Sequence, residues 1–134
     1  MKQTLISRSG GTLLALALTA GANAADYHTY DRVVFSSGTL ELGPYIHVKP
    51  DCSPNGRDEI KVVSGPSSGS IRVIQKTAAS KFSGDFEHCT GRPLPELFVI
   101  YRPRAGFAGS DALQVDVISP AGSELIDTYN ITVK

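Results

Sequence analysis

Apolar and polar residues alternate in short runs along the chain after residue 24, and turn-forming residues separate the runs. The alternation has a period of two, which is typical of strands with one buried face, and no run shows helical spacing. Gly, Pro, Ser and Asn between the runs favour turns. The pattern therefore predicts strands, at residues 33–35, 39–42, 45–49, 59–63, 70–75, 97–102, 112–118 and 124–133.

The last two predicted strands show the alternation most clearly, and the segment ISPAGSEL between them predicts a hairpin turn. Successive side chains of a strand point to opposite faces of its sheet. We therefore expect the apolar side chains of each strand to share one face: Leu113, Val115 and Val117 in the first strand, and Leu125, Tyr129, Ile131 and Val133 in the second.

Seven or eight short strands in a chain of this length fit a sandwich of two sheets. The domain would span residues 25–134, and about 100 residues is the usual size of an immunoglobulin-like sandwich. We therefore predict a single all-β domain with the architecture of an immunoglobulin-like two-sheet antiparallel β-sandwich.

From residue 63 onward the chain resembles the bacterial immunoglobulin-like or cadherin-like repeats of surface and secreted proteins. Those repeats carry a Gly-rich hairpin, a strand that ends in Tyr-x-Pro, then Gly-Phe-x-Gly-x-Asp and a final alternating strand. The resemblance implies the sandwich fold and is nearly silent on activity. The matching residues are Gly65, Pro66, Gly69, Ile71, Tyr101, Pro103, Gly106, Phe107, Gly109, Asp111, Leu113, Val115 and Val117.

The segment YRPRAGFAGSD, residues 101–111, has the composition of either a phosphate-binding loop or a corner between strands. No helix is predicted after it to supply an anion-binding N-terminus, so we predict the corner. Phe107 is expected to cover the end of the sandwich. We expect Gly106 and Gly109 to adopt backbone conformations that are costly for other residues, and Asp111 to accept local backbone N–H bonds.

The first 24 residues have the parts of a secretory signal peptide. Lys2 and Arg8 precede the apolar run TLLALALTA, and Ala22 and Ala24 supply the small-x-small pair of a cleavage site. The apolar run is too short to span a bilayer. We therefore predict cleavage after Ala24 and a bacterial protein that is periplasmic or secreted, with no membrane span after cleavage.

Without these 24 residues, the chain holds eleven basic and thirteen acidic residues, a net charge of −2. The basic residues are spread among acidic ones along the chain, whereas binding to nucleic acid requires a cluster of Lys and Arg. We therefore expect no nucleic-acid partner.

Cys52 and Cys89 are the only cysteines, which allows one intramolecular pairing in a compartment where disulfides persist. Closing a loop of about 37 residues would stabilise the domain by about 4 kcal/mol in the loop-entropy model. A reactive thiol or a metal-binding pair is the alternative, but a CxxC spacing is missing and His88 is a single neighbouring ligand. We predict the disulfide.

The motifs for catalysis are weak. GPSSG, residues 65–69, matches the G-x-S-x-G nucleophile motif with Ser67 at its centre, but a strand is predicted after it where that motif requires a helix. A Ser-His-Asp arrangement with His47 or His88 is an alternative that the spacing does not constrain. We predict no catalytic residue.

The motifs for metal binding are equally weak, because the three histidines lie far apart in sequence with no ligand at i+2 or i+4. One narrower alternative is a Cu(II) site. Cleavage after Ala25 would create the terminus Asp26-Tyr27-His28, in which the amine, two amides and the imidazole could surround the ion. We predict no metal and no cofactor.

The connection at residues 76–96 is the candidate partner-binding element. It lacks strand periodicity, and loops of this length in compact domains tend to be functional or disordered. A disulfide at Cys89 would pin the segment, which lowers the entropy lost on binding. The residues predicted to contact an unidentified protein partner are Phe82, Phe86 and Arg92, although the two phenylalanines could instead cap the core.

Together these features predict a non-catalytic binding or structural module that acts through protein–protein interaction. A small periplasmic inhibitor or assembly factor would present a stiff loop to its partner and is the first alternative. A small periplasmic hydrolase is the second, and it would need a cleft with convergent titratable residues.

Overall fold

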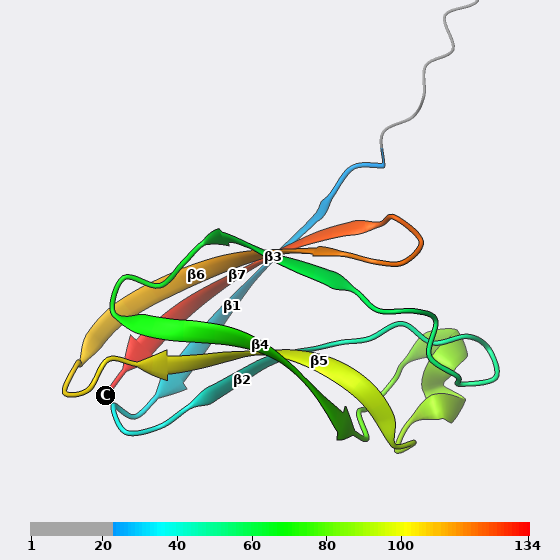
Figure 1. The fold of residues 1–134 in the computed structure, drawn as a ribbon, viewed down its shortest axis with the longest axis horizontal. Coiled ribbons are helices and arrows are strands. Elements are labelled where there is room, and N and C mark those ends of the chain that lie inside the picture. Colours follow the sequence, from blue (N-terminus) through cyan, green and yellow to red (C-terminus); the bar gives the residue numbers. More distant parts are fainter. Residues whose placement is uncertain (1–22) are drawn as a thin grey trace, which may run out of the picture.

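Seven strands form two sheets that pack face to face in a computed structural model, which describes residues 23–134 (Figure 1). The predicted all-β immunoglobulin-like sandwich is confirmed. Residues 1–22, which hold most of the predicted signal peptide, lie outside the described residues. The strands are β1 (Asp26–Val34), β2 (Leu40–Tyr45), β3 (Glu59–Ser64), β4 (Gly69–Ala78), β5 (Leu94–Pro103), β6 (Gly109–Ile118) and β7 (Glu124–Val133).

The order of the strands is β1-β7-β6-β3 in one sheet and β2-β5-β4 in the other. Every pairing is antiparallel except that of β1 with β7, which is parallel along the whole of β1. The sheets are therefore predominantly antiparallel, with one parallel pair at the edge formed by β1. β1 is free to pair in parallel because residues 35–39 carry the chain into the other sheet and do not turn it back as a hairpin.

Two predicted regions differ most from the observed strands. β1 begins at Asp26, although only residues 33–35 were predicted, because its inward positions are polar and hide the alternation. Residues 39–42 and 45–49 were predicted as two strands, but they contribute one strand, β2. The pairing of β2 with β5 shifts between Leu42 and Tyr45, and the chain then leaves the sheet, where Val48 forms only an isolated bridge to Pro54.

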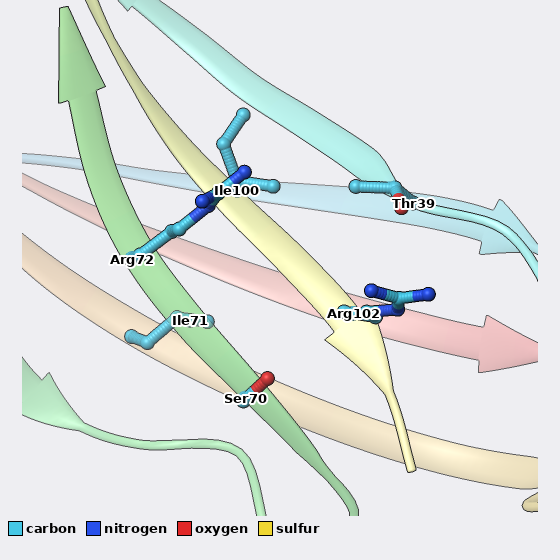
Figure 2. A pocket seen from close by; sticks show the side chains of 6 residues that line it. All are labelled: Thr39, Ser70, Ile71, Arg72, Ile100 and Arg102. Carbon is cyan, nitrogen blue, oxygen red and sulfur yellow. The ribbon is translucent and has the colours of Figure 1, made fainter. Parts of the chain in front are cut away.

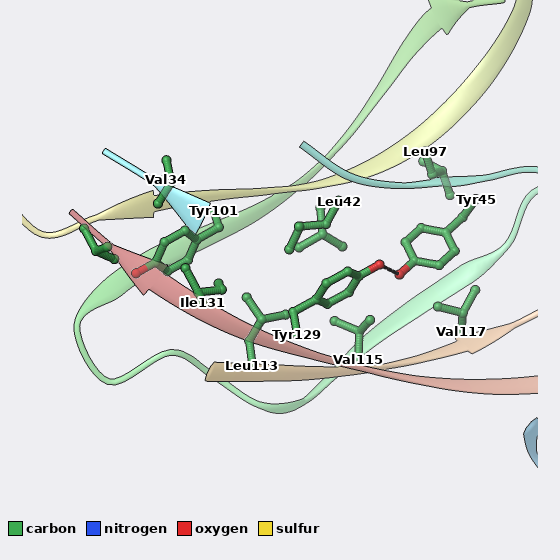
Figure 3. Close-up of a cluster of buried hydrophobic side chains, with 12 residues drawn as sticks. Val34, Leu42, Tyr45, Leu97, Tyr101, Leu113, Val115, Val117, Tyr129 and Ile131 are labelled. Carbon is green, nitrogen blue, oxygen red and sulfur yellow. Dashed lines mark hydrogen bonds between the residues drawn. The ribbon is translucent and has the colours of Figure 1, made fainter. Parts of the chain in front are cut away.

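The core lies between the two sheets and is built from the predicted faces of the last two strands (Figure 3). Val115 is fully buried, and the β5 residues Val99 and Tyr101 reach the same interior from the opposite sheet. The buried cluster consists of Val34, Leu42, Tyr45, Leu97, Val99, Tyr101, Leu113, Val115, Val117, Tyr129, Ile131 and Val133.

The corner between β5 and β6 has the predicted form. Gly106 and Gly109 have φ angles of 75° and 137°, a region that disfavours side chains. Phe107 packs against the core cluster. Asp111 accepts hydrogen bonds from the neighbouring backbone N–H of Ala112 and, beyond the prediction, from other segments of the chain.

The connections at the two ends of the sandwich differ in length. Residues 35–39, 65–68 and 104–108 make short turns at the end that holds the C-terminus (Figure 1). The opposite end, which we call the long-loop end, consists of residues 46–58, 79–93 and 119–123. The middle segment contains a 3₁₀ helix, η1 (Gly84–Cys89), and no helix among the described residues could span a membrane.

Candidate functional site

The three segments of the long-loop end form one continuous surface. A disulfide joins Cys52 to Cys89, with 5.4 Å between their Cα atoms, so the predicted bond is confirmed. The first and third segments also touch, since a Cβ atom built on Gly56 would lie 2.8 Å from the ring of Pro120. The surface is therefore held together by one covalent bond and by direct contact.

A second, smaller core lies beneath this surface. It surrounds the disulfide, and Cys89 is fully buried within it. Burial of apolar side chains on both sides of the disulfide fixes the two long segments against each other. The cluster consists of Val48, Cys52, Cys89 and Leu94, with the partly buried Ile46 and Phe82 packed against it.

Hydrogen bonds order the 79–93 segment along its length. Ser80 donates to the carboxylate of Glu96, through its backbone N–H at 3.2 Å and its hydroxyl at 2.6 Å. Glu96 is fully buried in β5, so this contact anchors the segment to the sheet. Further along, the backbone N–H of Phe82 donates to Oγ1 of Thr90 at 2.9 Å, which closes the loop around η1.

The structure places the three predicted contact residues in different environments. Phe82 is partly buried and packs against the second core, as the alternative of a core cap expects. Phe86 lies on η1 with 37% of its surface exposed, and Arg92 is exposed beyond the end of η1. Their contact with a partner stays a prediction, and Phe86 and Arg92 are the two whose side chains could make it directly.

The disulfide removes the alternative of a metal site at these cysteines. The sulfur atoms of Cys52 and Cys89 and a ring nitrogen of His88 lie within 4.8 Å of one another. However, the two sulfur atoms are bonded to each other, and a thiolate is the form that binds a metal. The His88 ring instead makes a 2.7 Å hydrogen bond between Nε2 and the carbonyl oxygen of Pro50.

A histidine and a buried acid form a pair at the base of the long-loop end. His47 Nδ1 lies 2.8 Å from Asp58 Oδ1, and the side chain of Asp58 is only 1% exposed. Among the described residues, the second carboxylate oxygen of Asp58 has no hydrogen-bond partner. Two hollows with volumes of about 310 and 320 Å³ border the pair. Both are lined by Tyr45, Ile46 and Asp58, and the first is also lined by His47.

A second polar cluster lies where β1 and β7 meet β2. The hydroxyl of Tyr45 donates to Asp127 Oδ2 at 2.7 Å and is also 2.7 Å from the hydroxyl of Tyr129 (Figure 3). Burial and the neighbouring Asp127 carboxylate raise the pKa of Tyr129 to about 12, and burial also raises the pKa of Tyr45. Both hydroxyls therefore stay protonated at neutral pH and serve as hydrogen-bonding groups. Tyr30 of β1 stacks on the Tyr129 ring, with 5.2 Å between ring centroids.

Sequence reasoning missed these acids as members of a site. The spacing of His47 and Asp58 follows no motif, because the pair forms only when the two ends of the 46–58 connection meet. The sequence pattern could have indicated Asp127. It occupies an alternating position on the same face of β7 as Leu125 and Tyr129, where a core-facing strand otherwise carries apolar residues.

The His47–Asp58 pair has the geometry of a general base held by a carboxylate. In the described chain, no serine hydroxyl is hydrogen-bonded to His47. The hydroxyls of Ser119 and Ser123, which line the hollow beside the pair, lie 2.6 Å from each other. Ser67 lies at the other end of the sandwich, in the turn before β4, as predicted, and there its hydroxyl donates to Asp111.

The alternative of a Cu(II) site at the N-terminus meets a structural obstacle. Residues 26–28 belong to β1 and pair with β7, with His28 opposite Asp127. A planar copper site would deprotonate backbone amides in this segment and would release it from the sheet. The His28 ring nitrogen Nδ1 instead lies 3.3 Å from the hydroxyl of Tyr30.

Comparisons with known proteins give little to add to this geometry. Neither the models of protein families nor the sequences of curated proteins yield a match. Among solved structures, the chain is similar to a 2,6-sialyltransferase from Photobacterium sp. JT-ISH-224, which was crystallised with CMP and lactose. The two are 10% identical with a TM-score of 0.40, and the match covers 84% of this chain but only 18% of the sialyltransferase chain.

Proposed function

We propose that this domain is a non-catalytic binding module of the periplasm or the extracellular space, and that it binds a protein partner through its long-loop end. One observation carries the proposal. The two longest connections lie at the same end of the sandwich, and a disulfide and a shared core tie them together. In variable immunoglobulin domains, the loops of one end likewise form the binding surface, an analogy at the level of the fold.

The backbone of the long-loop end is held in one conformation, and this reduces the entropy lost when a partner binds. A flexible loop loses conformational entropy when a partner fixes it, and this loss weakens the complex. Here the disulfide, the second core and the Ser80–Glu96 hydrogen bonds fix the backbone before any partner arrives. The side chains that remain exposed on it are therefore available at little entropic cost.

Phe86 and Arg92 supply the chemistry expected of a contact surface. Aromatic residues and arginine are enriched in protein interfaces. Phe86 offers exposed apolar area, and Arg92 offers a planar guanidinium with several N–H donors. Phe82 contributes indirectly, since it packs under the same segment and holds its position.

The proposed location outside the cytoplasm rests on two features. The N-terminal residues have the composition of a signal peptide, and the disulfide is a bond that persists in oxidising compartments. A cytoplasmic protein of this size would rarely retain such a bond. Expression with a readout of the N-terminal residue of the exported chain tests the location and the cleavage after Ala24 together.

The test of function compares matched variants at the two ends of the sandwich. Phe86→Ala and Arg92→Ala are expected to abolish capture of the partner from a periplasmic extract of the native host while each lowers the stability by less than about 1 kcal/mol. The controls are Phe35→Ala and Arg104→Ala, which remove exposed side chains of the same types from the short-turn end. Full capture by both loop variants, or equal loss with the controls, overturns the proposal.

A hydrolase is the second candidate, because the His47–Asp58 pair lies beside two hollows. Purified protein can be screened against ester, glycoside and peptide substrates, with His47→Ala as the matched variant. Turnover that disappears in His47→Ala would favour the hydrolase over the binding module. The absence of turnover together with capture of a partner favours the binding module.

A further inference from the structure

The outer face of the three-stranded sheet carries a site of different character, centred on Ile100. The odd-numbered residues of β5 face the core, so the even-numbered ones point outward. Strand pairing places Arg72 opposite Ile100 and Ser70 opposite Arg102. The two arginines are therefore diagonal neighbours on the same exposed face (Figure 2).

A hollow of about 370 Å³ lies among these side chains. Ile100 is almost fully buried although it faces outward, and both arginines are exposed beside it. Figure 2 shows the hydroxyl group of Ser70 on β4 and that of Thr39 in the turn just before β2. The site thus combines two guanidinium groups and two hydroxyl groups around an apolar residue. The lining residues are Thr39, Ser70, Ile71, Arg72, Ile100 and Arg102.

The positive charge of this hollow is not compensated by acidic residues of the described chain. Glu41 lies opposite Ile100 on β2, but its carboxylate pairs with Nζ of Lys76 at 2.5 Å. Glu96 on the same face is buried and accepts hydrogen bonds from Ser80. Among the described residues, neither guanidinium of the hollow forms an ion pair. Like charges on near-neighbour positions of one sheet face repel each other, and an anion bound between them would relieve this repulsion.

We propose that this hollow binds a tetrahedral oxyanion, a phosphate or sulfate group. Each guanidinium is a planar fork of N–H donors that matches two oxygens of such a group. Two forks balance a divalent anion in charge, and the hydroxyls of Ser70 and Thr39 can donate to its remaining oxygens. A carboxylate has two oxygens and one charge, so it would occupy one fork and leave the other free. The site is separate from the long-loop end and does not depend on the proposed function.

The direct test is a nuclear magnetic resonance titration with sodium phosphate and with sodium sulfate, against sodium chloride at equal ionic strength. The backbone signals of Ser70, Arg72 and Arg102 are expected to shift and to saturate with phosphate or sulfate. Because hydrogen bonds to charged groups are stronger than neutral ones, Arg72→Ala and Arg102→Ala should each weaken binding about tenfold or more. Arg72→Lys keeps the charge but loses the fork, so it should also weaken binding.

The matched control is Lys61→Ala, which removes one positive charge from the outer face of the opposite sheet. This variant is expected to bind phosphate as the parent does. Shifts that never saturate would mean an adventitious ion only and would overturn the proposal. So would a loss of phosphate affinity in Lys61→Ala as large as that in the two arginine variants. Circular dichroism of each variant establishes that it is folded before the titration is interpreted.

A phosphate group could come from a soluble molecule or from a lipid headgroup, and a second arm distinguishes the two. The protein is sedimented with vesicles of phosphatidylcholine, with and without phosphatidic acid. Sedimentation that requires phosphatidic acid and both arginines supports a lipid source. Saturable binding of free phosphate without sedimentation supports a soluble source, and failure of both arms contradicts the site.

Discussion

Asp111 is the residue whose replacement tests the packing of the short-turn end most sharply. Asp111 is 6% exposed, and its carboxylate accepts hydrogen bonds from three segments of the chain. The hydroxyl of Tyr101 donates to it at 2.8 Å, the backbone N–H groups of Ser67 and Ser68 at 2.9 and 3.1 Å, and that of Ala112 at 2.9 Å. The single acid therefore joins β5, β6 and the turn before β4.

The expected loss of stability follows from the donors that would be left without a partner. The Tyr101 hydroxyl is fully buried, so its loss of a partner in Asp111→Ala costs about 1–3 kcal/mol. The three backbone groups lie nearer the surface and can bind water, so together they add about 1–2 kcal/mol. We expect a total loss of about 3 kcal/mol for Asp111→Ala and about 1–2 kcal/mol for Asp111→Asn, which keeps one acceptor oxygen.

The effect should depend on pH with a defined sign. Burial alone would raise the pKa of Asp111, but the hydrogen bonds from Tyr101, Ser67, Ala112 and Ser68 outweigh it and hold the pKa below its ordinary value of 3.8. A carboxyl whose pKa is lowered by folding stabilises the protein above its unfolded-state pKa, and this stabilisation is lost as pH falls through the folded-state pKa. The stability difference between the parent and Asp111→Asn should therefore be smaller at about pH 2.5 than at about pH 7.

The assay is urea unfolding followed by far-ultraviolet circular dichroism, because the chain has no tryptophan. Asp116→Asn on the same strand is the matched control, since one of its carboxylate oxygens has no partner among the described residues, and it should lose little stability. The double variant with Tyr101→Phe should lose less than the sum of the single variants, since the two side chains share a hydrogen bond. Unchanged stability of Asp111→Asn at neutral pH, or a difference that grows in acid, would refute this reasoning.

Three further predictions concern stability and use the same unfolding assay. Replacing Cys52 and Cys89 together by alanine should cost about 4 kcal/mol in the loop-entropy model, and two reactive thiols in the oxidised native protein would contradict the bond. Phe82→Ala should lower the free energy of unfolding by about 2 kcal/mol, because Phe82 packs against the second core. Phe86→Ala should lower it by less than about 1 kcal/mol, because Phe86 is partly exposed. A larger loss for Phe86→Ala than for Phe82→Ala would contradict these two environments. Gly69→Ala should cost about 2 kcal/mol or more because the added Cβ would lie 2.5–2.8 Å from a ring and a backbone oxygen of β5, and a stable variant would contradict that contact.

The parts of the fold that could be predicted from sequence are those in which one face of a strand is apolar. β6 and β7 were predicted nearly to their ends because their buried positions alternate with polar ones. β1 escaped prediction before residue 33, since its inward side chains His28, Tyr30 and Arg32 are polar and face the edge of the sandwich. The end of β2 at Tyr45 depends on a shift in its pairing with β5, which no local pattern encodes.

Some features of the candidate site could be predicted from sequence and others could not. The pairing of Cys52 with Cys89 was predictable because only two cysteines are present, and the length of the 79–93 segment marked it as a candidate element. The separation of Phe82 from Phe86 was not predictable, because it depends on which side of η1 meets the second core. The contact of His47 with Asp58 was likewise not predictable, because it forms only where the two ends of the 46–58 connection meet.

The central claim is that the long-loop end binds the partner, and position-specific photo-crosslinking in the native host tests it most directly. A photoreactive amino acid is placed at Phe86 or Ala121 in the long-loop end, and at Ser37 or Ala105 in the short-turn end. The account predicts adducts of one common mass from both positions of the long-loop end and none from the short-turn end. Adducts from the short-turn end, with both long-loop positions silent, would contradict it.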